Sequence, residues 1–311
     1  MTEAGPRAIA SASNERFRRL LALVGSSRER TRAGVVVLEG VHLLQAWSQR
    51  FGPDATPIEL YAARRGIADP EIAQWLARHG ARAVVLEDRL FDRASGVEHG
   101  AGLLAIVPLP EGRLPDRIED DAVYLDRLQD PGNVGTVLRS CAAVGVGRVL
   151  CAPGTAACWS PKVLRAAMGA HFRLEIHEGI DAAELRARCR IAVVATGAAA
   201  AGSLYDADLR APTLWLLGNE GQGLGSTLKA WPDARRVSIP QSDAVESLNV
   251  GVAAALCLYE QWRQRGFVGS GGAGATRGRT RAAPSRRSPR STSSSTIASE
   301  CARDASAPRP G

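Results

Sequence analysis

The stretch "DPGNVGTVLRS", residues 130–140, combines a helix start with side chains that can do chemistry. Asp130 can cap a helix N-terminus, and Pro131 suits the first helical position. A helix N-terminus offers free backbone N–H groups that bind phosphates and carboxylates. Asn133 can donate and accept hydrogen bonds, and Arg139 lies about 9 Å further along the helix axis. The stretch predicts an anion-binding helix entry, although an ordinary capped helix with a surface arginine fits these residues as well.

A second stretch, "LWLLGNEGQGLG" at residues 214–225, runs from an apolar strand into four glycines and one acid, Glu220. Glycines directly after a parallel strand lie at the edge of the sheet where ligands bind in open α/β folds. They allow a ligand to approach the backbone, or they allow positive φ in a flexible turn. The glycine spacing does not match the dinucleotide-binding fingerprint, because Ser226 stands where the third glycine belongs, and no phosphate-binding P-loop motif occurs in the chain.

A third stretch, "VSIPQSDAVESLNVGVAAALCLYEQW", covers residues 237–262. It predicts a strand that ends at Pro240, a polar loop, and a long apolar helix opened by Ser247 and Asn249. Ser247 is the predicted N-cap, and the helix after it belongs to the core. This structural interpretation leaves both polar side chains free to face a ligand as well.

The elements that must position these stretches alternate between helix-like and strand-like patterns. Before residue 108 the sequence predicts helices at 14–24, 41–51 and 69–80, the last with Gly80 as its C-cap, and strands at 34–40, 57–64, 82–88 and 102–108. The proline-rich and charged segment 108–121 has the composition of an interdomain linker. Beyond it, short and fully apolar strands at 122–125, 148–152, 191–196, 214–219 and 236–240 are typical of a parallel sheet buried on both faces.

Charge is unevenly distributed along the 311 residues. The net charge is +7, but the segment from residue 266 onward holds eight arginines against one glutamate and one aspartate, so the rest is almost neutral. Bulk charge therefore does not identify a nucleic-acid-binding surface in the body of the chain. The segment 266–311 is of low complexity and poor in large apolar residues, which predicts a disordered basic tail. Residues 1–12 are small and polar, and we expect them to be loose.

The six cysteines occur without any CxxC pair, and most of them lie in apolar runs. This pattern favours buried thiols in a reducing cytoplasm over a metal site or a disulfide framework. No apolar run approaches the roughly 18 residues that a membrane span needs, and the first residues lack an apolar signal core. We therefore expect a cytoplasmic protein with no bound metal and no membrane partner.

Together and in this order, the three stretches resemble the three motifs of the SpoU/TrmH family of RNA 2′-O-ribose methyltransferases, in the SPOUT superfamily. "LDRLQDPGNVGTVLRS" is similar to motif one, "LLGNEGQGLG" to motif two and "IPQSDAVESLNVGVAAA" to motif three. The segment "SPKVLRAAMGAHFRL", residues 160–174, looks like the connecting helix of the family. The resemblance covers roughly residues 14–265 and is strongest from 122 onward.

The resemblance implies an α/β fold in four parts. Residues 13–107 look like the ribosomal-protein-like α/β domain that binds the RNA substrate, and 108–121 would be the linker. Residues 122–265 would form the SpoU-type methyltransferase domain with a deep trefoil knot, a rare exception among protein folds. The tail 266–311 has no counterpart in the family pattern. The resemblance also implies S-adenosylmethionine as cofactor and a homodimer whose active site lies near the subunit interface.

The resemblance also assigns roles to individual residues. The matching catalytic positions are Asn133, Arg139, Glu220, Ser247 and Asn249. The positions that should bind the cofactor are Thr196, Gly197, Gly218, Gly221, Gly223, Ile239 and Leu248. The family has been argued to use the motif-one arginine as a base, but a guanidinium does not readily give up its proton. A phosphate-clamping and electrostatic role suits Arg139 better.

The substrate implied is RNA, and the separate N-terminal domain favours 23S rRNA over tRNA. Two other classes remain open from the sequence: a catalytically silent RNA-binding or ribosome-assembly protein on the same fold, and a nucleotide-cofactor oxidoreductase on a doubly wound sheet. The complete set of polar motif residues argues against the first class, and the missing dinucleotide fingerprint argues against the second.

Overall fold

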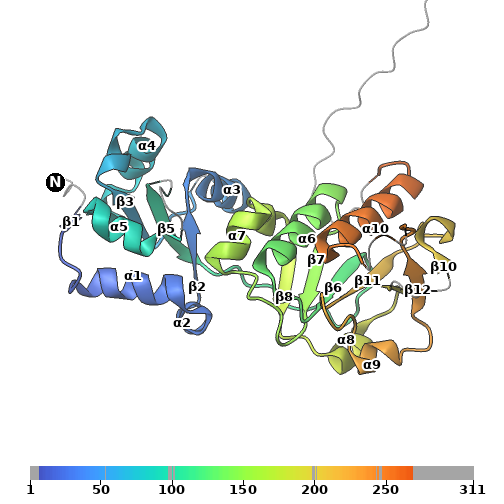
Figure 1. The fold of residues 1–311 in the computed structure, drawn as a ribbon. Coiled ribbons are helices and arrows are strands. Elements are labelled where there is room, and N and C mark those ends of the chain that lie inside the picture. The colour runs from blue at the N-terminus through green and yellow to red at the C-terminus, as the bar shows by residue number, and fades with distance from the viewer. Residues whose placement is uncertain are drawn as a thin grey trace, which may run out of the picture. The chain divides into compact units, whose positions relative to one another are not determined.

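Two β-sheets organise the chain (Figure 1), for which a computed structural model describes residues 7–268 except 53, 97–99, 101, 198–199, 201, 243 and 245–246. The first sheet has five strands in the order β1-β4-β3-β5-β2, and β5 runs antiparallel to both of its neighbours. Its strands are β1 (Arg7–Ile9), β2 (Val35–Glu39), β3 (Glu59–Ala63), β4 (Ala83–Leu86) and β5 (Leu103–Pro108).

Helices cover both faces of this first sheet. Its helices are α1 (Glu15–Gly25), α2 (Ser27–Ala33), α3 (Val41–Phe51), α4 (Pro70–Arg78) and α5 (Asp88–Ala94). Alternate residues of one strand point to opposite faces. Val35 and Val37 of β2 therefore pack with α1 and α5, whereas Val36 and Leu38 pack with α3 and α4.

The second sheet has seven strands, all parallel, in the order β10-β12-β9-β11-β6-β7-β8. Its strands are β6 (Ala122–Asp126), β7 (Arg148–Cys151), β8 (Glu175–Glu178), β9 (Ala192–Thr196), β10 (Gly202–Ser203), β11 (Thr213–Gly218) and β12 (Arg235–Ser238). Both faces are buried, as the fully apolar strands predicted. Trp215 and Leu217 pack on one face, and Leu214 and Leu216 pack on the other.

The helices of this half divide between those two faces (Figure 1). Helices α6 (Pro131–Val144), α7 (Pro161–Ala167) and α10 (Val250–Gln264) share a core cluster with Trp215 and Leu217, and α8 (Ala182–Arg188) and α9 (Ser226–Lys229) share one with Leu214 and Leu216. Gly135 lets α6 approach α7 closely, because a Cβ atom at this position would overlap Ala166.

The entry of α6 agrees with its sequence. The Asp130 side chain accepts the backbone N–H of Asn133 at 2.8 Å, and Pro131 occupies the first turn. The helix ends at Val144 and is capped by Gly145, whose φ of 83° is left-handed. Asn133 therefore stands in the first turn of α6, at the edge of the sheet where β6 ends.

Several local predictions were wrong. The helix predicted at 69–80 ends at Arg78 and has His79, not Gly80, as its C-cap, because a 3₁₀ turn follows directly. The connecting helix of 160–174 ends at Ala167, where Met168 adopts a left-handed φ of 50°. Asn249, not Ser247, caps α10, since its side chain accepts the N–H groups of the next turn.

The N-terminal segment is less loose than predicted, because Arg7–Ile9 pairs with β4 as an edge strand. Residues 1–6 lie outside the described part of the chain, and so does the predicted disordered tail from residue 269 onward. Residues 266–268 are described, and the ring of Phe267 packs edge-on against Trp262 at 5.0 Å between ring centroids.

The cysteines behave as buried thiols where they are described. Those at 141, 151, 158 and 257 are buried and Cys189 is partly buried, whereas Cys301 lies outside the described residues. Burial raises the pKa of the Cys257 thiol to about 12, so this thiol stays protonated at neutral pH. Within the described segments, no helix is long and apolar enough to cross a membrane.

Candidate functional site

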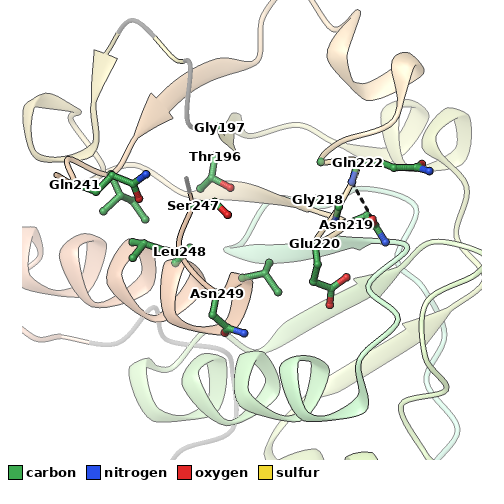
Figure 2. A pocket seen from close by; sticks show the side chains of 15 residues that line it. Thr196, Gly197, Gly218, Asn219, Glu220, Gln222, Gln241, Ser247, Leu248 and Asn249 are labelled. Atoms are coloured by element: carbon green, nitrogen blue, oxygen red, sulfur yellow. Dashed lines mark hydrogen bonds between the residues drawn. The ribbon is translucent and has the colours of Figure 1, made fainter. Parts of the chain in front are cut away.

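A pocket of about 680 Å³ lies where the carboxyl ends of β9 and β11 and the segment from β12 to α10 meet (Figure 2). This volume is within the usual range for small-molecule and cofactor sites. All seven residues predicted to bind a cofactor line it: Thr196, Gly197, Gly218, Gly221, Gly223, Ile239 and Leu248. Three predicted catalytic residues, Glu220, Ser247 and Asn249, line it too.

The glycine loop, residues 218–225, forms one wall of the pocket and is held by its own backbone. Asn219 and Gly223 exchange both backbone hydrogen bonds, at 3.1 and 2.9 Å. The Asn219 side-chain oxygen accepts the N–H groups of Gly221 and Gln222, at 3.0 and 3.1 Å. Asparagine favours such turns because its side chain can replace a backbone acceptor. These four bonds favour the folded turn of the loop.

Two further bonds tie the glycine loop to the end of β6. The Asn219 side-chain amide donates to the Arg127 carbonyl at 2.8 Å, and the Asp126 carboxylate accepts the backbone N–H of Gly225. Arg127 has a left-handed φ of 58°, uncommon for a residue with a side chain. Its guanidinium pairs with Asp126, whose side chain is buried.

Glycines keep the pocket open. A Cβ atom at Gly197 or Gly223 would meet no other atom within 4 Å, so the absent side chains leave space for a ligand. Gly218 is required for the packing of the loop, because a Cβ atom there would overlap the backbone of Gly223 and Leu224. One set of glycines gives room to the ligand, and Gly218 gives room to the loop itself.

A chain of hydrogen bonds runs along one side of the pocket. Asn249 caps α10 with its side-chain oxygen and donates its amide to the Asn133 oxygen at 2.8 Å. Asn133 in turn donates its amide to Glu220 Oε1 at 3.1 Å. Figure 2 shows Glu220 and Asn249 reaching toward the same region from the glycine loop and from α10. Residues 133, 220 and 249 are far apart in the sequence, and the fold brings them into one polar group.

The other two predicted catalytic residues, Ser247 and Arg139, do not belong to this hydrogen-bond chain. Ser247 lines the pocket but makes no hydrogen bond within the described part of the chain. Arg139 does not line the pocket. Its side chain is exposed on α6 and has no hydrogen-bond or ion-pair partner among the residues that the structure describes.

Five pocket residues were not predicted: Asn219, Gln222, Gln241, Val250 and Ala253. Asn219 stands inside the quoted glycine stretch, and an asparagine followed by glycines is itself a turn signal that could have identified it. Asp126 and Arg127 were also missed as supports of the loop, although both stand at the carboxyl end of a predicted parallel strand. Over the described residues, no cluster of His, Cys, Asp and Glu is placed to hold a metal ion.

The chain is similar to known RNA methyltransferases. Residues 121–259 match the SpoU rRNA methylase family. A 23S rRNA (uridine(2479)-2′-O)-methyltransferase of Streptomyces viridochromogenes is 32% identical over 81% of this chain and 91% of its own. The 23S rRNA (guanosine-2′-O-)-methyltransferase RlmB of Bordetella pertussis is 33% identical over 75% of this chain and 99% of its own.

The fold has solved counterparts as well. The crystal structure of the SpoU methyltransferase AviRb from Streptomyces viridochromogenes, in complex with the cofactor AdoMet, superposes with a TM-score of 0.71. That alignment covers 81% of this chain and 98% of the other, at 29% identity. The similarity thus extends through both sheets.

Proposed function

Because this chain belongs to the SpoU rRNA methylase family, we propose that it transfers a methyl group from S-adenosylmethionine to a ribose 2′-hydroxyl of 23S rRNA. Two relatives that it matches over nearly their whole length are named for this reaction, one on uridine and one on guanosine. Since these two bases differ, the shared chemistry is that of the ribose. The proposal therefore specifies the sugar oxygen and leaves the base open.

The observation that carries the proposal is the polar chain Asn249–Asn133–Glu220 beside the glycine-walled pocket. A methyl transfer between two bound molecules needs a place for each of them and a fixed geometry between them. The pocket offers the first place. The amide and carboxylate groups at its edge offer hydrogen bonds to the hydroxyls and phosphates of a ribose.

The residues present fit an adenosyl sulfonium cofactor. Gly197 and Gly223 leave open space where side chains would stand, and Ile239 and Leu248 supply apolar surface for an adenine ring. Thr196 and Ser247 add hydroxyl groups to the same lining. We propose that the seven predicted residues bind this cofactor.

When bound, the cofactor supplies a methyl group that is already activated by the positive sulfur. The protein must then align the ribose with it, and alignment alone can contribute on the order of 7–11 kcal/mol. We assign ribose placement to Asn133, Asn249 and Ser247, which stand at or beside the pocket. Arg139 is assigned to an RNA phosphate, since a guanidinium binds phosphate strongly.

Arg139 can take this role through a second copy of the chain, and we propose a homodimer. Helices α6 and α10 lie side by side (Figure 1), and α10 exposes an apolar stripe of Val252, Leu256 and Tyr259. A stripe of this kind on a monomer favours association. Packing this face against a second copy would bury the stripe, and we propose that Arg139 of one protomer then serves the pocket of the other.

We further propose that the three pocket-forming segments, around residues 196–197, 218–223 and 239–249, belong to a trefoil knot. Thr196, Gly218, Ile239 and Leu248 come from these three segments and line one pocket, which supports this threading. Residues 13–107 would be the RNA substrate-binding domain, 108–121 the linker and 122–265 the methyltransferase domain. An enzyme of 23S rRNA works where ribosomes are assembled, so the proposal includes a cytoplasmic location.

Mapping 2′-O-methyl sites in total RNA tests the proposal directly. A strain that lacks the gene should lose one ribose methylation in 23S rRNA, and the plasmid-borne gene should restore it. Purified protein should bind S-adenosylmethionine in calorimetry and methylate rRNA from the deletion strain. If the deletion strain instead loses a 2′-O-methyl group in tRNA, the substrate is tRNA and not 23S rRNA.

Two results would reject the enzymatic proposal. An unchanged methylation map together with no affinity for S-adenosylmethionine would favour a silent RNA-binding protein. Binding of NADH, measured by its fluorescence, would favour an oxidoreductase instead.

A further inference from the structure

Glu220 differs in kind from the rest of the pocket. Among the described residues that line the pocket, it is the one ionisable side chain, and the others are glycines, amides, hydroxyls and apolar groups. A ribose hydroxyl attacks poorly until its proton is removed, and a positioned acceptor within hydrogen-bond reach accelerates that removal. A carboxylate can serve as that acceptor, whereas a neutral amide or hydroxyl is a far weaker base.

The hydrogen-bond chain has a fixed direction. The Asn249 oxygen is committed to the N–H groups of Gly251 and Val252 in the first turn of α10, so its amide nitrogen must donate. This nitrogen donates to the Asn133 oxygen, and the Asn133 nitrogen can then only donate to Glu220 Oε1. The helix start thus orients two amides in series, and both bonds point toward the carboxylate.

Only half of the Glu220 carboxylate is used by this chain. Oε1 accepts from Asn133, and Oε2 makes no hydrogen bond within the described ranges. The side chain is exposed at the pocket. Asn133 and Asn249 each keep a second amide hydrogen, which can donate to a ribose or phosphate oxygen.

Arg139 cannot fill this role. It does not line the pocket of its own chain, and a guanidinium has five N–H donors and no acceptor. Even if a second copy of the chain brings Arg139 to the ribose, it can stabilise negative charge there but cannot take up a proton.

We propose that Glu220 Oε2 accepts the proton of the ribose 2′-hydroxyl during methyl transfer, an inference that rests on the proposed function. The 2′-oxygen forms a bond to the methyl carbon, and the carbon–sulfur bond breaks with its electron pair going to sulfur. The sulfonium becomes a neutral thioether. The O–H electron pair stays on oxygen, and the proton passes to Oε2 and then to solvent. Asn133 and Asn249 are positioning residues in this step.

The variant Glu220→Gln separates the chemical role from a structural one. Glutamine keeps an oxygen that can accept from Asn133, so the hydrogen-bond chain survives while the carboxylate is lost. We expect single-turnover methylation of an unmethylated 23S rRNA transcript to slow by at least about 100-fold. The Kd for S-adenosylmethionine, measured by calorimetry, should change by less than about threefold, since the loop bonds of Asn219 remain.

Chemical rescue gives a second readout. In Glu220→Ala, added formate can occupy the vacated space and accept the proton, so the rate should rise with formate concentration. The same salt should not restore Glu220→Gln, whose amide fills that space. Glu175→Gln, at an exposed ion pair on the edge strand β8, is the matched control and should keep the wild-type rate with and without formate.

The outcomes are separable. If the wild-type protein methylates rRNA and Glu220→Gln works within about threefold of it, Glu220 only positions Asn133 and the inference is wrong. A failure of formate to restore Glu220→Ala overturns it as well. If the wild-type protein itself transfers no methyl group to RNA, the proposed function fails, and this inference fails with it.

Discussion

The Asp126 carboxylate accepts the backbone N–H of Gly225 at 2.6 Å. This bond crosses from the end of β6 to the end of the glycine loop, and the Asn219 amide makes a second crossing bond to the Arg127 carbonyl. The wall of the pocket is therefore held from outside the pocket, by residues that do not line it.

Asp126→Ala should weaken cofactor binding without removing any pocket side chain. The Gly225 N–H, which is partly buried, would lose its acceptor, and a buried group left unsatisfied costs up to about 1–3 kcal/mol. We expect the Kd for S-adenosylmethionine to rise at least about tenfold, because the loop no longer holds one shape. Asp126→Asn retains an acceptor oxygen, so its Kd for S-adenosylmethionine should lie between those of the wild type and of Asp126→Ala. An unchanged Kd in the alanine variant would show that the loop holds itself.

Arg139→Ala should abolish turnover and leave cofactor binding nearly intact. The side chain is exposed and stands away from the pocket, so its loss removes a contact to RNA and none to the cofactor. We expect kcat/KM to fall by at least about 100-fold with a Kd for S-adenosylmethionine within about twofold of wild type. Lys229→Ala, on α9 at the opposite face of the sheet, is the control. Wild-type turnover in Arg139→Ala would remove this residue from the site.

His171 makes the fold sensitive to acid. The ring is buried and its Nε2 lies 2.8 Å from the Cys158 carbonyl, which fixes the proton on Nε2. Nδ1 has no partner among the described atoms, and burial lowers the pKa of His171 to about 4. An unfolded histidine has a pKa of about 6.5, so between these values the unfolded state binds more protons. The free energy of unfolding should therefore rise with pH from 4 to 6.5.

The size of this effect follows from the pKa difference. Acidification from pH 7 to pH 4 should cost roughly 3 kcal/mol from His171. Urea unfolding at several pH values measures it. Glutamine in His171→Gln keeps an N–H donor for the Cys158 carbonyl but has no titratable group. The free energy of unfolding of this variant should therefore depend less steeply on pH. His79 and His177, whose pKa values burial also lowers, contribute equally to both proteins. If the free energies of unfolding of wild type and His171→Gln change equally with pH, His171 is not the source of the acid sensitivity.

Apolar and alternating runs predicted nine of the described strands, whereas β1, β8 and β10 were not predicted. Parallel strands buried on both faces are short apolar runs, and their carboxyl ends meet at one edge. The family resemblance supplied Thr196, Gly218 and Ile239 as cofactor positions, and the structure places them at or just after the ends of three such runs, where they line one pocket.

Two features of the site could not be predicted from local sequence patterns: the N-cap of α10 and the direction of the Arg139 side chain. Ser247 and Asn249 are both good N-caps, and only the packed start of α10 decides between them. Arg139 is six residues after Asn133, which places it about 240° around the helix as well as about 9 Å along it. An argument from axial distance alone could not show that the two side chains leave α6 in different directions. The roles of the predicted catalytic residues stay predictions until variants are measured.

The Glu39–Arg165 ion pair should be a strong determinant of stability. Arg165 on α7 donates to Glu39 Oε2 at 2.9 Å, and the Glu39 side chain at the end of β2 is 6% exposed. Ser95 donates to the other oxygen. Arg165→Met would leave this buried carboxylate without its counter-ion, which costs about 3–5 kcal/mol in comparable pairs.

Urea unfolding of three proteins tests this expectation. The single variant Arg165→Met should be destabilised by about 3 kcal/mol, while Glu39→Gln/Arg165→Met should recover most of the loss, because a neutral glutamine can still accept from Ser95. The pair joins β2 to α7, and α7 packs on α6, which carries Asn133. The single variant should therefore also raise the KM for rRNA. If the free energy of unfolding of Arg165→Met lies within about 1 kcal/mol of wild type, then water solvates the Glu39 carboxylate well enough without Arg165, and the ion pair contributes little to stability.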